Sequence, residues 1–493
     1  NSCGTCEPGC TADNYGPAHD SPYTPAPEEG SGLVVDNDGA LALDVNNIQF
    51  EHIWIANSSE NTVSKLSTET GREMGRYRMT EGCGNPSRTA VDLDAAVWVA
   101  CREGGRVLKI AAATRQCDDR NNNGVIDTSR DLDDNGRIEG AELLAAGTDE
   151  CVLFSVHVAG SVARAMAIDP SNNAWVGVWD NSTYYQLDGR TGEILGSVSA
   201  GGNPYGAAIY GKTLWSSNRG NGTLARIDIA TRERTGLWSV GGCVSLYGIG
   251  VDPEGDVWIG NFSCGDVLRF NKDGESFSRI ATGGRPRGIA VTADGMVFAG
   301  LYEANQVAKI RISDAAVVGR FPVGQQGIIG VALDDQGFVW GVNYGSATAT
   351  KMDQNGTIVG SYPVGQGPYT YSDMTGQALR TFAAPRGIYR VQLTSPCKNG
   401  TEWREVGAVT ETPASTAVEF TLYVAPSAEE LFSPSATKAG PFRVDSDLTE
   451  IPGNLRGLPR HKFALLETAL ISEDRERTPT VSGFHVEYVC VIP

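Results

Sequence analysis

Apolar and polar positions alternate in short runs between residues 50 and 382, and an aromatic residue stands inside such a run at regular intervals. Runs of this length, separated by turns that contain Gly, Asp or Asn, are typical of short β-strands. A further strand-like segment precedes most of the runs, and two more follow each of them. The pattern predicts seven structural repeats, whose marker residues are Trp54, Trp98, Trp175, Trp215, Trp258, Phe298 and Trp340.

The marker residues are separated by 44, 77, 40, 43, 40 and 42 residues, and the long interval falls to 42 when the 35 residues 117–151 are set aside. Four short strands per ~40–45 residues are typical of a β-propeller blade, with a solenoid of four-stranded units as the alternative. We therefore predict an all-β fold with a seven-bladed β-propeller over residues 31–382 and an insert at residues 117–151. Residues 367–376 resemble the leading strand that the first repeat lacks, whereas residues 31–46 could add an outer strand or pack beneath the propeller.

The two ends of the chain depart from the repeat. Beyond Phe382 the period stops, and longer alternating runs predict a small β-sandwich over residues 383–493, which resembles the jelly-roll modules of secreted bacterial proteins. Residues 1–30 combine three cysteines with prolines and acidic residues, so we expect an extended N-terminal arm. Such an arm could link the chain to a neighbouring subunit.

The net charge restricts the class of partner. The 493 residues include 40 Lys and Arg against 59 Asp and Glu, which gives a formal charge of −19 at pH 7. Nucleic acids and anionic membrane surfaces attract clusters of basic residues, which the sequence lacks, so neither is an expected partner. No apolar stretch reaches the ~18–20 residues that span a bilayer, and we expect no membrane span.

Cysteine spacing points to an oxidising compartment. Eight of the eleven cysteines fall into pairs that are close enough in sequence, or at the ends of one predicted module, to form disulfides. This interpretation favours a secreted protein in an extracellular or cell-surface setting, and it leaves Cys3, Cys6 and Cys10 as an odd set. The predicted pairs are Cys83 with Cys101, Cys117 with Cys151, Cys243 with Cys264, and Cys397 with Cys490.

The insert carries the strongest chemical signal, because residues 131–142 match a calcium-binding EF-hand loop position by position. Gly136 allows the sharp turn at the sixth position, and Glu142 can supply two oxygens at the twelfth. The predicted Ca²⁺ ligands are Asp131, Asp133, Asn135, the backbone carbonyl of Arg137, Glu139 and Glu142.

A second, less complete loop precedes it. Its oxygen-bearing residues have the same early spacing, but Arg130 stands at the twelfth position, so Asp131 is a candidate to supply the missing carboxylate. Tandem loops of this kind resemble those of dockerins and thrombospondin-type modules, and the alternative is a solvated acidic loop. We expect Ca²⁺ to be structural in either loop. The candidate ligands of this first loop are Asp119, Asn121, Asn123 and Asp127.

A propeller places the starts of its innermost strands and the loops after its second strands at the same end of the central channel. Both sets are rich in arginine and tyrosine, which are favoured at binding surfaces. A water-filled channel would also be lined by polar residues, and this is the alternative. The predicted ligand-binding residues of the strand starts are Arg88, Arg164, Tyr205, Tyr247, Arg287 and Tyr369. The loops add Trp179, Asp180, Arg219, Tyr302, Glu303 and Tyr344.

Residues 246–261 and 285–298, with the sequences LYGIGVDPEGDVWIGN and RPRGIAVTADGMVF, resemble the repeat of the NHL and virginiamycin B lyase-like propellers. The resemblance covers residues 50–380 and implies a seven-bladed fold. It also implies, for the lyases, a histidine with a carboxylate and a divalent ion on one face of the ring. The chain has five histidines, none of which lies in the last four repeats. The position after the aromatic strand holds Asn57, Asn218, Asn261 or Asn343.

These observations favour a secreted, calcium-stabilised propeller that binds a protein or carbohydrate, or has a structural role, at a cell surface or in an extracellular assembly. One alternative is a propeller lyase or hydrolase that acts on a polysaccharide or cyclic peptide. Another is a polymer-forming subunit that is linked through its N-terminal arm.

Overall fold

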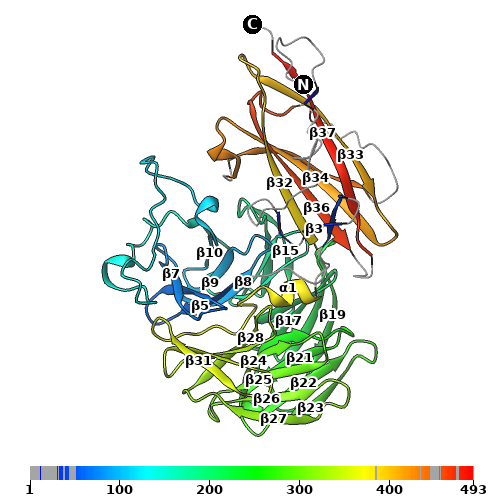
Figure 1. Cartoon of the computed structure of the whole chain (residues 1–493). Helices are drawn as coiled ribbons and strands as arrows, with labels where there is room; N and C mark the ends of the chain where they lie inside the picture. Colours follow the sequence, from blue (N-terminus) through cyan, green and yellow to red (C-terminus); the bar gives the residue numbers. More distant parts are fainter. Residues whose placement is uncertain are drawn as a thin grey trace. The chain divides into compact units, whose positions relative to one another are not determined.

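The computed structural model describes residues 11–12, 30–31, 33–36, 39–43, 51–382, 386–432, 435–444, 455, 457–472 and 477–491. The chain divides into two compact units. One comprises residues 50–383 and is called here the propeller unit. The other comprises residues 1–49 with 384–493 and is called the two-sheet unit (Figure 1).

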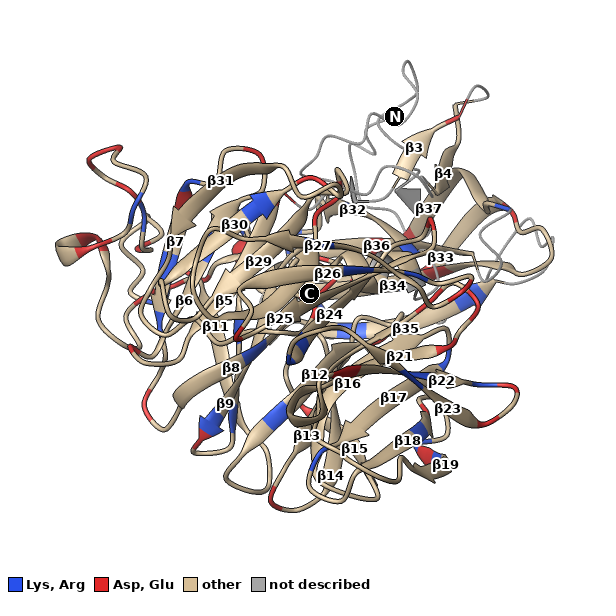
Figure 2. Cartoon of the chain, turned by 90° about the horizontal axis from the view of Figure 1, so that it is seen from below, with Lys and Arg blue, Asp and Glu red and all other residues tan. Residues whose placement is uncertain are grey.

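In its described part, the propeller unit contains seven antiparallel sheets that follow one another along the chain, as the repeat predicts. Within each sheet, the strands are paired in sequence order, and the first strands of successive sheets are neighbours. In Figure 2, β12, β16 and β24 lie nearer the middle of this unit than β14, β19 and β23. This arrangement is a β-propeller, and the prediction of an all-β fold is confirmed.

The strands of the first four blades are β5 (His52–Asn57), β6 (Thr62–Ser67) and β7 (Glu73–Arg78); β8 (Gly84–Val91), β9 (Val97–Glu103), β10 (Arg106–Ile110) and β11 (Val152–His157); β12 (Ala163–Ile168), β13 (Ala174–Val178), β14 (Thr183–Leu187) and β15 (Ile194–Ser199); and β16 (Pro204–Tyr210), β17 (Thr213–Asn218), β18 (Thr223–Asp228) and β19 (Glu233–Ser239).

The last three blades are β20 (Leu246–Val251), β21 (Val257–Asn261), β22 (Asp266–Asn271) and β23 (Ser276–Ala281); β24 (Pro286–Val291), β25 (Met296–Leu301), β26 (Gln306–Arg311) and β27 (Val317–Pro322); and β28 (Ile328–Leu333), β29 (Val339–Asn343), β30 (Thr348–Met352) and β31 (Ile358–Pro363). The unit also contains the 3-10 helices η1 (Thr114–Gln116), η2 (Gly140–Glu142) and η3 (Phe262–Cys264), and the α-helix α1 (Gln377–Phe382).

The aromatic marker residues are buried because they form the core between blades. In four blades an aspartate six positions earlier ends the first strand, and its carboxylate accepts a hydrogen bond from the indole N–H. A buried indole N–H needs such a partner, and the same aspartate closes the turn between the two strands, so one carboxylate satisfies both. These pairs are Asp92 with Trp98, Asp169 with Trp175, Asp252 with Trp258, and Asp334 with Trp340, at 2.8–3.1 Å.

Ring closure uses the segment after the last blade, as expected. The backbone N–H of Trp54 in β5 donates to the carbonyl of Met374 at 2.9 Å, and the N–H of Tyr369 donates to the carbonyl of Ala56 at 2.8 Å. On its other side, the hydroxyl of Thr375 donates to the carbonyl of Leu333 in β28. Residues 368–375 therefore lie between the first and last blades and join them without a covalent link.

The two-sheet unit is built from two five-stranded antiparallel sheets. Both contribute side chains to one buried cluster that includes Leu41, Trp403, Phe420, Leu466 and Phe484. One sheet contains β1 (Thr11–Ala12), β3 (Leu33–Val35), β4 (Leu41–Leu43), β33 (Thr401–Glu411) and β37 (Thr480–Cys490). The other contains β2 (Gly30–Ser31), β32 (Arg386–Thr394), β34 (Thr416–Ala425), β35 (Thr437–Val444) and β36 (Phe463–Ser472), and η4 (Glu429–Phe432) follows β34.

The predicted start of the propeller at residue 31 differs from the structure. The apolar segments of β3 and β4 form a hairpin, and β4 pairs with β37 in the two-sheet unit. Residues 368–375 already occupy the place in the first blade that this segment would otherwise fill. The side chains of Leu41 to Leu43 are instead buried in the two-sheet unit, which lies outside the propeller's boundary at residue 50.

The four cysteine pairs expected from spacing are the four disulfides of the structure. They join Cys83 to Cys101, Cys117 to Cys151, Cys243 to Cys264, and Cys397 to Cys490. Cys3, Cys6 and Cys10 lie outside the described residues. Among the helices that the structure describes, none has the length and apolar character needed to span a membrane.

Candidate functional site

The six predicted ligand-binding residues meet at one end of the channel. Five lie near the start of an innermost strand, and Tyr369 lies on the closing segment. Each of these strands pairs with the second strand of its blade, and the pairing shifts register at or next to the predicted residue. The shift includes Arg164 in β12, Tyr205 in β16, Tyr247 in β20 and Arg287 in β24, and it falls just before Arg88 in β8. A bulge inserts an unpaired residue and re-aims its side chain. The recurrent bulge therefore explains why these blades present Arg88, Arg164, Tyr205, Tyr247 and Arg287 at the same place.

The inner part of this site is a buried layer of two arginines and three tyrosines. The Arg164 guanidinium donates to the hydroxyl of Tyr205, to that of Tyr371 at 3.0 Å and to that of Tyr369 at 3.4 Å. Arg88 stacks on the ring of Tyr371, 3.3 Å from its centroid, and donates to the carbonyl of Tyr205 at 2.8 Å. The side chains of this layer hold one another in place.

The outer part is half-buried and has arginines without polar partners. Arg219 and Arg287 approach the ring of Tyr247 to 4.7 and 5.1 Å from its centroid. Arg287 also lies 4.1 Å from the ring centroid of Tyr302 and 4.3 Å from that of Phe262. No described residue accepts a hydrogen bond from either guanidinium. We call these two arginines and three rings the outer layer.

The electrostatics of the mouth are positive. Within the described residues, no carboxylate lies within 4.0 Å of Arg88, Arg164, Arg219 or Arg287, whereas the buried Lys109 and Lys351 each pair with an aspartate. Burial raises the pKa of Tyr205, but the charges of Arg164 and Arg88 outweigh this effect and lower the pKa to about 7. The two arginines therefore favour the ionised form of the Tyr205 side chain.

The residues predicted from the mouth loops also contact other parts of the chain or lie at its rim. Asp180 is part of a turn, because its carboxylate accepts the backbone N–H groups of Ser161 and Val162. Glu303 pairs with Arg285 at 2.6 Å. Tyr344 lies at the rim, 39% exposed. The half-buried Trp179 packs edge-on against Tyr205 at 5.6 Å between centroids.

Sequence reasoning missed Tyr371 and Arg102 as parts of the site. Tyr371 follows Tyr369 by two residues on the extended closing segment, and the spacing of alternate strand residues could have placed both on one face. Arg102 lies at the end of β9, with its guanidinium 4.6 Å from the ring centroid of Tyr369. Burial, followed by the charge of Arg164, lowers the pKa of Arg102.

The residues after the aromatic strands have a structural role. Asn57, Asn218, Asn261 and Asn343 are fully buried. Their amides hold the following loops, for example through Asn218 to the carbonyl of Ala200 at 2.9 Å. Of the described histidines in this unit, His52 lies in β5, where burial and then Lys65 lower its pKa to about 4, and His157 lies in β11.

At the other end of the channel, the same innermost strands line a cavity of about 80 Å³. Its walls are mostly aliphatic, with Met166, Ile209, Val291 and Leu333 among them, and α1 contributes Leu379. The two ends of the channel therefore differ in character, and arginine and tyrosine gather only at the first among the described residues.

In the second loop of the insert, three of the predicted calcium ligands lie close enough together to hold a metal ion. Ligand oxygens of Asp131, Asp133 and Glu142 lie within 4.8 Å of one another. Gly136 has φ +81°, which the sharp turn needs. The backbone N–H groups of Leu132 and Glu139 donate to Glu142 and lower its pKa, so this side chain is held as a carboxylate.

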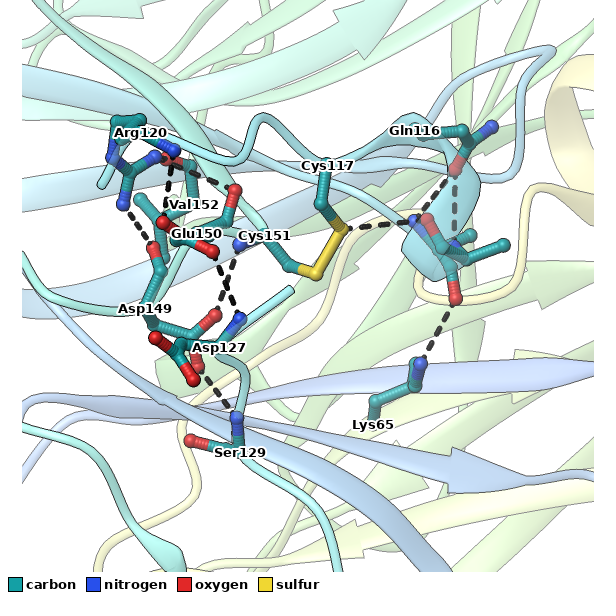
Figure 3. The surroundings of a disulfide bond; sticks show 12 residues. Lys65, Gln116, Cys117, Arg120, Asp127, Ser129, Asp149, Glu150, Cys151 and Val152 are labelled. Carbon is teal, nitrogen blue, oxygen red and sulfur yellow. Dashed lines mark hydrogen bonds between the residues drawn. A yellow bond between two sulfur atoms is a disulfide. The ribbon is translucent and has the colours of Figure 1, made fainter. Parts of the chain in front are cut away.

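The first loop is completed from a distance. Glu142 accepts the N–H groups of the second, third and ninth residues of its own loop, Leu132, Asp133 and Glu139. Glu150 accepts the N–H groups of the same three positions of the first loop, Arg120, Asn121 and Asp127, at 2.8, 3.2 and 2.8 Å. The carboxylate at this place therefore comes from Glu150, which is buried beside the Cys117–Cys151 disulfide, and not from Asp131 (Figure 3).

The insert rests on the first blade. The N–H of the buried Ile138 donates to the carboxylate of Glu73 in β7 at 2.9 Å, and the N–H of Glu73 donates to the carbonyl of Gly136 at 3.2 Å. Arg72 adds an ion pair with Asp131 at 2.8 Å. Figure 1 shows the insert, coloured cyan, beside β7 and β10. It thus connects the second blade to the blade in which the ring closes.

No family model matches the chain. Among solved structures, a chain of Kuenenia stuttgartiensis hydrazine synthase is 16% identical with a TM-score of 0.49, and the match covers 69% of this chain and 98% of that one. A catalytically inactive virginiamycin B lyase from Staphylococcus aureus with quinupristin is 13% identical with a TM-score of 0.45, over 68% and 95% of the two chains. A functionally unknown protein from Desulfotomaculum acetoxidans is 15% identical with a TM-score of 0.49, over 63% and 95%.

Among curated proteins, the virginiamycin B lyase of Nocardia farcinica is 26% identical over 193 residues, which is 39% of this chain and 67% of that protein. Over this part of its length, the chain is therefore similar to virginiamycin B lyase, in agreement with the β-propeller seen in its sheets.

Proposed function

We propose that this chain is a calcium-stabilised propeller that binds a protein or carbohydrate partner at the arginine- and tyrosine-rich mouth of its channel. The observation that supports the proposal is the convergence there of cationic and aromatic side chains from different blades, with guanidinium groups left unpaired. An extracellular or cell-surface setting is compatible with the four disulfides of the structure.

Calcium has a structural role in this proposal. Oxygens of Asp131, Asp133, Asn135 and Glu142, with the carbonyl of Arg137 and with Glu139 at the ninth position, would hold one ion. Asp119, Asn121, Asn123, Asp127 and Glu150 would hold a second. Ca²⁺ prefers six to eight such oxygen ligands. Because residues of the second loop contact Glu73 and Arg72, the ion in that loop would stabilise the blade through which the ring closes.

Binding can be tested with a broad panel of candidate ligands. Wild-type protein would be applied to an array of immobilised oligosaccharides and peptides, beside Tyr344→Ala, which removes an exposed rim ring. Arg311→Ala is the matched surface control, because β26 begins after the mouth loop and ends at Arg311 on the opposite side. We expect signals that fall in Tyr344→Ala and persist in Arg311→Ala. Signals that are absent, or equal in all three proteins, would contradict the proposal.

A lyase is the second candidate, and the similarity to virginiamycin B lyase is the observation in its favour. The matching test is incubation with quinupristin, the compound named with one of the similar structures. A ring-opened product in the mass spectrum would support this candidate, and unchanged quinupristin would count against it.

A further inference from the structure

Four arginines of the mouth, Arg88, Arg164, Arg219 and Arg287, fall into two classes. Arg88 and Arg164 are 1% and 5% exposed, and each donates to oxygens of its neighbours. Arg219 and Arg287 are half-buried, contact aromatic rings, and donate to no described residue. A guanidinium has five N–H donors in a planar fork that matches an oxyanion in two places. The outer pair is therefore free to bind a ligand.

The positive charge of this site favours a negatively charged ligand. The protein carries −19 overall, yet within the described residues the four arginines of the mouth have no carboxylate partner. A partly desolvated cation costs free energy unless an anion pairs with it. Within the inner pair, Arg164 donates to the hydroxyl of Tyr205 and Arg88 donates to its backbone carbonyl. Among the residues that the structure describes, no oxygen accepts a hydrogen bond from the guanidinium of Arg219 or Arg287.

The shape of the outer layer favours a sugar over a peptide side chain. The cluster at the mouth consists of aromatic rings with a single aliphatic member, Ile329. Phe262 and Tyr302 lie 6.1 Å apart, and Tyr344 and Tyr369 are also 6.1 Å apart, each pair edge to face. Rings held at angles to one another offer flat faces to the C–H groups of pyranoses, and the phenols and guanidinium groups offer partners to hydroxyls. The described apolar cavity, which could hold a peptide anchor, is lined by residues at the opposite end of the channel.

We propose that the mouth binds an acidic saccharide, with a carboxylate or sulfate of the sugar held between Arg219 and Arg287 above Tyr247, and with neighbouring sugar rings on Tyr302 and Phe262. This inference rests on the proposed function and specifies its ligand class. The carboxylate and the sulfate share the oxyanion chemistry that the two arginines recognise, so the test must separate them.

The test is isothermal titration of the full chain in calcium with four probes. Oligogalacturonate carries carboxylates, a chondroitin sulfate oligosaccharide adds sulfates, maltohexaose is neutral, and poly-glutamate is an acidic peptide. We expect one or both acidic saccharides to bind, with affinity that falls as salt rises. Hydrogen bonds to charged groups predict a loss of about tenfold or more in Arg219→Ala and in Arg287→Ala. Arg311→Ala should bind as the wild type does.

Other outcomes overturn the inference. If maltohexaose binds as tightly as the acidic saccharides, the oxyanion has no role. If poly-glutamate binds as tightly, the ligand class is an acidic peptide. If neither acidic saccharide binds, the ligand is of another class. If the arginine variants bind normally, the saccharide binds at another site. Maltohexaose could bind with an affinity that falls in Tyr302→Ala but not in the arginine variants. This result would support the proposed binding function and contradict the inference of an acidic saccharide. Arg219→Lys and Arg287→Lys, which keep the charge but lose the planar fork, show whether geometry contributes.

Discussion

The carboxylate of Glu150 accepts a hydrogen bond from the backbone N–H of Asp127 at 2.8 Å, as the carboxylate of Glu142 does from Glu139 in the neighbouring loop. Glu150, which lies 23 positions after Asp127 in sequence, thus takes the place that Arg130 holds in the loop itself. This relationship makes the two loops of the insert equivalent in structure, although only the second is complete in sequence.

Replacement of Glu150 by Gln should remove one of two calcium sites. The amide keeps the size of the side chain but donates hydrogen bonds where the carboxylate accepts them, and it lacks the charge that the ion requires. We expect calcium titration by calorimetry to show two ions per chain in the wild type and one in Glu150→Gln. Glu193→Gln, on the exposed turn before β15, is the control and should retain both. Two ions in Glu150→Gln would show that the first loop does not use this carboxylate.

Removal of calcium should lower the thermal stability of the propeller. The ligand carboxylates would repel one another without the ion, and the insert would lose its ordered contacts with Glu73 and Arg72. Scanning calorimetry with and without a chelator measures this effect, and the shift should be reversed by added Ca²⁺ and not by Mg²⁺, which requires a more rigid, octahedral site. An unfolding temperature that is the same with and without the chelator would exclude bound calcium.

The Cys117–Cys151 disulfide should matter most when calcium is absent. It closes a loop with a sequence separation of 34, and chain entropy predicts a contribution of about 4 kcal/mol for a loop of this length. We expect the double variant Cys117→Ser, Cys151→Ser to lose more stability in chelator than in calcium, because the ions also restrict the loop. Equal losses under both conditions would mean that disulfide and ions act independently.

Tyr205 should titrate in the neutral range. Its folded-state pKa of about 7 lies below that of an unfolded tyrosine near 10, so its ionisation stabilises the folded protein fully above pH ~10. This contribution is lost as the pH falls towards 7. The wild type should therefore gain stability over Tyr205→Phe between pH 7 and pH 10, and a phenolate absorbance should appear near pH 7 only in the wild type. Parallel stability profiles would contradict the role of Arg164 and Arg88.

The repeats and three of the four disulfides could be predicted because each depends on short spacing along the sequence. Cys397 and Cys490, with a sequence separation of 93, were paired because they stand at the two ends of one predicted module. A marker such as Trp258 and the aspartate six residues before it lie within one hairpin, so the pattern appears in a short window of sequence. The mouth residues were predicted from their position at strand starts. The bulges that direct Arg164 and Tyr205 into the channel were not predicted, because a register shift depends on pairing with the neighbouring strand.

Long-range features were harder to predict. Glu150 reaches the first predicted calcium loop from the far end of the insert, which the Cys117–Cys151 disulfide holds beside its beginning. The hairpin of β3 and β4 has an alternating apolar pattern that suits either unit. The hairpin belongs to the two-sheet unit because β4 pairs with the edge of β37, and because the closing segment already completes the first blade of the propeller.

The most direct test of the account is a crystal structure of the protein grown with calcium and oligogalacturonate. We expect a sugar across the mouth, with one carboxylate within hydrogen-bond distance of both Arg219 and Arg287. A saccharide bound elsewhere, with these two arginines paired to residues of the chain itself, would contradict it.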